Sequence, residues 1–158
     1  MAQRDIFFKT AAEEDDFETG RVLVSEYANG LGTNLAFQGF EAELQQLNKQ
    51  YSKPGGGLLL VYLDGVPAGT AGVRRLDSHA AELKRMFIRP AYRGIGLGAA
   101  LLEQCLVLAQ QLGYTAIRLD TLDTMAPAIA LYKRYGFYTI PAYCFNPLDG
   151  AVYMEKLL

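Results

Sequence analysis

Apolar residues recur at helical spacing in two stretches of the first third of the chain. Residues 11–31 read AAEEDDFETGRVLVSEYANGL, with Phe17, Val24 and Tyr27 among the apolar positions and an acidic start that suits a helix N-terminus. Residues 37–51 read FQGFEAELQQLNKQY and repeat the same spacing before SKPGGG ends it. We therefore expect one helix in each stretch.

The next part of the chain has the pattern of paired strands. A continuous apolar run at 58–63 ends at Asp64-Gly65, a strong hairpin signal, and 67–73 supplies a returning strand. A turn at 76–79 leads into a strand that ends at Ile88. The remaining expected elements are a strand at 5–10, helices at 97–112 and 126–135, and strands at 116–120, 137–140 and 151–156.

This order of elements predicts one α/β (α+β) domain over residues 1–158, with a mixed sheet. A chain of 158 residues that is 51% hydrophobic and 20% charged has the composition of an ordinary globular protein. The net charge of −2 gives no electrostatic reason to expect nucleic acid or an anionic membrane as a partner. The N-terminal residues lack the apolar region of a signal peptide, so we expect a cytoplasmic protein.

The stretch RPAYRGIGLG, residues 89–98, places three glycines at alternate positions between an expected strand and an expected helix. Backbone N–H groups at a helix start have no partner within the helix, and glycines let an anion approach them. The turn therefore predicts an anion site. Gly94, Gly96, Ala99 and Asp120 also fit a dinucleotide fingerprint, but residues 89–93 separate the first glycine from the strand, which that fingerprint does not allow.

The stretches ELKRMFIRPAYRGIGLGAALLEQCLVLAQQLGYTAIRLDT and AIALYKRYGF resemble the GNAT superfamily of acetyl-CoA-dependent N-acetyltransferases. FQGFEAEL and NPLDGAVYMEKLL resemble a bacterial subfamily of mostly unassigned substrate. The resemblance implies a single-domain fold of about seven strands and about four helices, with the sheet splayed at the cofactor site. It also makes a homodimer one expected state, since family members often pair through their sheets.

The resemblance implies that main-chain groups hold acetyl-CoA. The pyrophosphate is expected on the backbone amides of Arg93, Gly94, Ile95, Gly96, Leu97 and Gly98. The pantetheine arm is expected to pair with the main chain of Met86, Phe87 and Ile88. One departure is Met125, where the family often has an asparagine that contacts the cofactor.

Two residues match the positions of catalytic groups in the family. Glu82, 11 residues before Arg93, has the offset of the general base, and the alternative is a surface glutamate paired with Lys84 or an arginine. A carboxylate of pKa about 4.3 is about six units below an ammonium, so a relay through water is favoured over direct abstraction. Tyr132 matches the general acid that protonates the departing thiolate, and the alternative is a core tyrosine.

The family builds its acceptor pocket from the first two helices, their connection and the late strands. The candidates are Tyr27, Phe37, Phe40, Arg74, Arg75, Tyr143 and Asn146. If either arginine faces the pocket, a carboxylate-bearing amine such as an amino acid would fit. No metal is expected, because His79 is the one histidine and no His/Cys/carboxylate cluster stands out along the chain.

We therefore expect an enzyme that transfers the acetyl group of acetyl-CoA to the amine of a small molecule, by direct attack in a ternary complex. Two alternatives stay open. One is a non-catalytic module that binds acyl-CoA as a sensor or regulator. The other is an acetyltransferase whose acceptor is a peptide or protein amine.

Overall fold

A computed structural model of the protein describes residues 4–31 and 39–158, and seven strands of these residues form one sheet. The strands are β1 (Ile6–Thr10), β2 (Gly57–Leu63), β3 (Val66–Arg75), β4 (Ala80–Ile88), β5 (Ala116–Leu122), β6 (Tyr138–Ile140) and β7 (Ala151–Leu157). The helices are α1 (Glu14–Leu31), α2 (Phe40–Gln45), α3 (Leu47–Gln50), α4 (Leu97–Gln111) and α5 (Ala126–Arg134), and a 3-10 turn, η2, covers Pro90–Tyr92.

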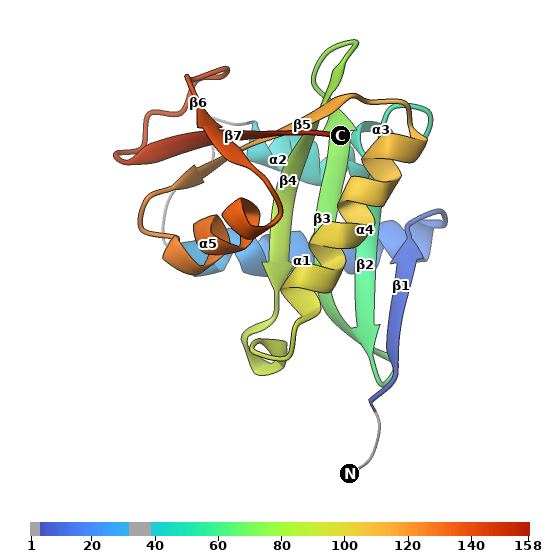
Figure 1. The fold of residues 1–158 in the computed structure, drawn as a ribbon. Helices are drawn as coiled ribbons and strands as arrows, with labels where there is room; N and C mark the ends of the chain where they lie inside the picture. The colour runs from blue at the N-terminus through green and yellow to red at the C-terminus, as the bar shows by residue number, and fades with distance from the viewer. Residues whose placement is uncertain (1–3, 32–38) are drawn as a thin grey trace.

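The sheet is mixed, as the element order predicted. Its strand order is β1-β2-β3-β4-β5-β7-β6, and β4 and β5 form the parallel pair among antiparallel neighbours. In Figure 1, α4 crosses the front of β2, β3 and β4, whereas α1 lies behind the sheet. No helix of the described residues is long and apolar enough to span a bilayer.

The second expected helix is divided in the structure. Gln46, with φ −122°, separates α2 from α3, so the described residues hold five α-helices instead of about four. Apolar residues keep their spacing across the break, which is why the pattern alone predicted one helix. Phe37, the first residue of that prediction, lies outside the described residues.

Strand β2 is apolar throughout because helices cover both of its faces. Leu59 and Val61 belong to the main core, which also holds Leu101 of α4. Leu58 points to the other face and packs in a second cluster with Phe17 of α1. A strand buried on both sides reads as a continuous apolar run, as 58–63 does.

Strands β4 and β5 pair only at their beginnings. The paired residues run from Ala80 to Glu82 on β4 and face the first three residues of β5. On its other side β4 carries a bulge, because two of its residues lie between the pairs Gly72–Lys84 and Thr70–Phe87 where β3 has one. Arg85 occupies this bulge with a left-handed φ of 58°. The divergence and the bulge together open the sheet and redirect the side chains that follow Glu82.

Candidate active site

A cavity of about 560 Å³ lies where β4 and β5 separate. Its walls come from residues 83–88 of β4, the glycine turn before α4, the end of β5 and one side of α5. Tyr27 of α1 and Asn146 complete the wall. The three glycines of the turn and the expected pantetheine segment of β4 therefore border the same space.

The glycine turn owes its shape to two left-handed residues. Gly94 has φ 82° and Gly96 has φ 89°, values that residues with a Cβ adopt only at a cost. Gly98 lies in the first turn of α4, and a Cβ built there would be 3.9 Å from its nearest neighbours, which is ordinary contact. All three line the cavity, as do Arg93 and Leu97, whereas the side chain of Ile95 is exposed.

The dinucleotide interpretation fails on local geometry. The turn η2 stands between β4 and the first glycine, so no glycine follows the strand directly. Asp120, the acidic residue of that fingerprint, faces Lys84 with a separation of 3.6 Å between Oδ1 and Nζ.

Arg93 fastens the turn to the end of β4. Its Nε donates to the main-chain oxygen of Ile88 at 2.8 Å, and its guanidinium lies 5.6 Å from the centre of the Phe87 ring. The main chain of Ile88 is one of the expected partners of the pantetheine arm. In the structure, one of its two polar groups already has a partner from this chain.

Tyr132 lines the cavity from α5 with 8% of its surface exposed. Burial is the main reason that the pKa of its hydroxyl is raised, and nearby Tyr27 adds to the effect. Within residues 4–31 and 39–158 the hydroxyl has no hydrogen-bond partner. Tyr132 is therefore a protonated phenol on a residue that lines the cavity.

Glu82 lies behind the cavity wall and is only 3% exposed, so it is not a surface glutamate. Its Oε1 accepts from Nε of Arg74 at 3.0 Å, and its Oε2 accepts from the Tyr143 hydroxyl at 2.7 Å. Burial and the neighbouring carboxylate raise the pKa of Tyr143, which keeps that phenol a donor. Both oxygens of the expected base are thus occupied by this chain.

The seven acceptor candidates do not form one set. Tyr27 and Asn146 line the cavity. Phe40, Arg74 and Tyr143 do not line the cavity and belong to a layer of side chains behind it, where they contact Arg85 or Glu82. Arg75 is exposed. Phe37 is outside the described residues.

A buried ion pair that the sequence analysis missed supports this layer. Glu43 of α2 is 2% exposed, and its carboxylate accepts from Nε of Arg85 at 2.7 Å and from Nη2 at 3.2 Å. Arg74 donates to the same carboxylate at 3.4 Å. A signal was available, because Glu43 lies three residues after Phe40 and four before Leu47 and so falls on the apolar face of the predicted helix.

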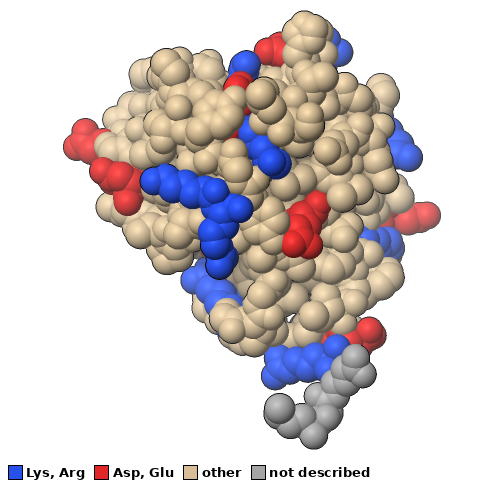
Figure 2. All heavy atoms as spheres, in the orientation of Figure 1, with Lys and Arg blue, Asp and Glu red and all other residues tan. Residues whose placement is uncertain are grey.

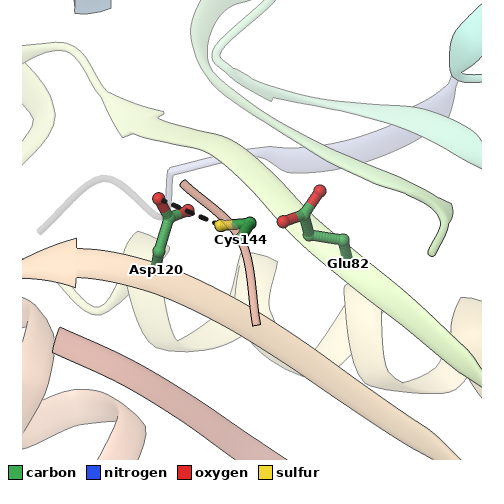
Figure 3. Close-up of side chains that lie close together, drawn as sticks. All are labelled: Glu82, Asp120 and Cys144. Carbon is green, nitrogen blue, oxygen red and sulfur yellow. Dashed lines mark hydrogen bonds between the residues drawn. The ribbon is translucent and has the colours of Figure 1, made fainter. Parts of the chain in front are cut away.

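Tertiary structure also gathers Glu82, Asp120 and Cys144, whose ligand-type atoms lie within 4.8 Å of one another (Figure 3). The sequence analysis found no such cluster because the three residues come from β4, β5 and the segment before β7. Cys144 points between the two carboxylates, with Sγ 4.0 Å from Oδ2 of Asp120.

Each carboxylate of this cluster faces a cation, so the cluster has the character of a charge-balanced group of side chains more than of a metal site. Arg74 faces Glu82, and Lys84 faces Asp120, which also accepts from Asn146 at 3.1 Å. Burial, with Asp120 adding to it, raises the pKa of the Cys144 thiol to about 11.

Charged groups on the visible surface are dispersed. The face in Figure 2 carries small groups of Lys and Arg and of Asp and Glu, some of which lie beside each other, within a larger uncharged surface. On this face, charge does not mark a broad area of one sign.

Comparison with known proteins identifies relatives by sequence and by fold. The profile of the Acetyltransferase (GNAT) family matches residues 24–137. An uncharacterized N-acetyltransferase of Schizosaccharomyces pombe is 38% identical over 150 residues, covering 93% of this chain and 90% of its own. A crystal structure of an acetyltransferase from Streptococcus agalactiae covers 97% of this chain and 98% of its own, with a TM-score of 0.79 and 23% identity.

A Salmonella typhimurium protein solved with its cofactor acetyl-CoA has the same fold, with a TM-score of 0.67 and 17% identity over 97% of this chain and 94% of its own. The family profile spans more than half of the chain and covers both the glycine turn and Tyr132. The chain belongs to the GNAT acetyltransferase family.

Proposed function

We propose that this acetyltransferase transfers the acetyl group of acetyl-CoA to the amine of a small molecule, with both substrates bound together. The cavity between β4 and β5 is the observation that carries the proposal. It has a glycine-rich helix start at one end and a buried polar layer at the other, so one space serves an anionic cofactor and a polar acceptor. Its volume of about 560 Å³ is in the range of clefts that bind cofactors and small molecules.

The glycine turn is the proposed seat of the pyrophosphate. Gly94 and Gly96 leave open space where a Cβ would lie, and Gly96 precedes the 15-residue helix α4, whose positive dipole end favours anions. The main chain of Met86 and Phe87 borders the cavity beyond the paired part of β4 and suits the pantetheine arm. Acetyl-CoA in the Salmonella typhimurium relative supports the same cofactor here.

Acetyl-CoA supplies an acyl carbon activated as a thioester. In the reaction, a bond forms between the amine nitrogen and this carbon, and the bond from carbon to sulfur breaks. Tyr132 donates its phenolic proton to the departing sulfur, because it lines the cavity and has the position of the family's general acid. That proton is replaced by the one the amine gives up.

Glu82 takes only an indirect part in the proposed reaction. Arg74 and Tyr143 occupy its two oxygens, and it does not line the cavity, so the amine proton reaches it only through a relay of water or a hydroxyl. Asp120 is the carboxylate on the cavity wall itself. Tyr132, placed where a proton donor is required, favours an enzyme over a sensor without turnover.

The test is calorimetric titration of acetyl-CoA into the wild type, Gly98→Asp and Gly98→Ala. Gly98 accepts a Cβ without strain, so Gly98→Asp places a carboxylate at the turn while the backbone is preserved. Repulsion between this carboxylate and the pyrophosphate should weaken binding about 100-fold, and Gly98→Ala should stay close to the wild type. Equal binding by all three proteins, or none by the wild type, would contradict the proposed site.

A further inference from the structure

Lys84 is a buried cation whose hydrogen-bonding capacity is unused. Its side chain is 8% exposed, yet it lines the cavity. Among the described residues its ion-pair partner is Asp120, at 3.6 Å, which is too long for a hydrogen bond. In the part of the chain that the structure describes, Nζ donates no hydrogen bond, although an ammonium has three donors to satisfy.

The other cations of the cavity wall are paired, as is Arg85, or lie at the glycine turn, as does Arg93. Arg85 donates twice to Glu43, at 2.7 and 3.2 Å, and packs over the ring of Phe40. Arg93 belongs to the glycine turn, where it holds the Ile88 oxygen. Lys84 is therefore the cation of this wall that can receive a new anionic partner.

The position of Lys84 separates it from the proposed cofactor seat. It lies two residues beyond Glu82, the last residue of β4 that pairs with β5. Ile88, where the strand meets the glycine turn, is four residues further on, beyond the bulge at Arg85. An anion on Lys84 therefore lies at the acceptor end of the cavity.

Arg74 is the cation that the sequence analysis offered for this purpose. It donates to Glu82, Glu43 and Gln50 and does not line the cavity. An acceptor carboxylate would have to break that network to reach it. An acceptor carboxylate can bind Lys84 without breaking such a network.

We propose that the acceptor is an amino acid and that Lys84 binds its carboxylate. This inference rests on the proposed acetyl transfer to an amine. Asp120, beside Lys84 on the same wall, offers a carboxylate oxygen to the acceptor's amine. Glu82 and Arg74 balance each other, as do Asp120 and Lys84, so a neutral zwitterion adds no net charge to the layer.

The test compares acceptors that differ only in the carboxylate. Thiol release from acetyl-CoA is measured for the twenty protein amino acids and for the amines that their decarboxylation gives. We expect at least one amino acid to have a kcat/KM about 10- to 150-fold above that of its decarboxylated partner, the range of one hydrogen bond to a charged group. Lys84→Met should bring this ratio close to one.

The ratio does not depend on the fraction of folded enzyme, because both acceptors meet the same preparation. Lys49→Met, at an exposed position on α3, is the matched control and should keep the wild-type ratio. Acetyl-CoA binding by Lys84→Met should stay within about threefold of the wild type, which shows that Lys84 serves the acceptor.

Three results would overturn the inference while acetyl-CoA still binds: a panel in which no amino acid is acetylated, a wild-type ratio of one or below, or a ratio that survives in Lys84→Met. Loss of acetyl-CoA binding in Lys84→Met would instead assign this side chain to the cofactor and would overturn it as well. The proposed function fails separately, if the wild type does not bind acetyl-CoA.

Discussion

The two ends of the cavity are built in opposite ways. At the proposed cofactor end, residues 93–98 form one turn that borders the cavity at every position except Ile95, and two glycines give this turn its shape. At the acceptor end, the polar layer takes side chains from α2, β3, β4, β5 and the segment before β7. One end is a local motif, and the other exists only when five parts of the chain come together.

This difference shows which end of the cavity can be altered by single substitutions. Main-chain groups are the same for every residue, so the cofactor end depends on backbone conformation and on glycine. The acceptor end depends on which charges face each other, and single substitutions can alter it. A family that keeps one cofactor and varies its acceptors can be built on such a division.

The largest expected effect is at the buried ion pair of the acceptor end. Glu43→Ala leaves the guanidinium of Arg85, which is 4% exposed, without its principal partner. We expect the free energy of unfolding in urea to fall by about 3–5 kcal/mol, because an uncompensated charge stays buried. Glu41→Ala, at an exposed position of the same helix, should change it by about 0.5 kcal/mol or less. A loss below about 1 kcal/mol for Glu43→Ala would show that the layer tolerates an unpaired arginine.

The proposed reaction depends on the side chain of Tyr132. Tyr132→Phe removes the proposed proton donor but no hydrogen bond among the described residues, so stability should be kept while kcat falls about 100-fold. Steady-state rates with acetyl-CoA and an accepted amine measure this. Tyr135→Phe is the matched control, since its hydroxyl bonds Glu103 outside the cavity, and its rate should be unchanged. Equal rates for both variants would remove Tyr132 from the mechanism.

The smallest effect compares two glycines of the cofactor end. Gly96→Ala forces a Cβ into a left-handed conformation, with φ 89°, and should lower the free energy of unfolding by about 1–2 kcal/mol. Gly98→Ala adds the same methyl group to an ordinary helical position and should raise it by up to about 1 kcal/mol. Urea melts of the two variants measure the difference. Shifts of the same sign would mean that backbone conformation does not distinguish these positions.

Local patterns predicted most of the fold. Hairpin and turn residues divided the strands correctly, and amphipathic spacing located α1, α4 and α5. The break at Gln46 escaped, because the apolar spacing of Leu44 and Leu47 continues across it. Local patterns also predicted only part of the candidate site. Tyr132 and residues 93–98, except Ile95, border the cavity as expected, whereas Glu82 and Arg74 lie behind it.

The sequence by itself determined the glycine turn, because glycine adopts a left-handed φ at no steric cost and a helix start has free N–H groups wherever it lies. Only the tertiary structure decided the partners of the charges. Glu43 and Arg85 are 42 residues apart, and Glu82 and Tyr143 are 61 apart. Their pairing depends on the bulge at Arg85 and on the point where β4 leaves β5, and residue type specifies neither. Lys84 lines the cavity at the same divergence, where we propose that its charge selects an acceptor.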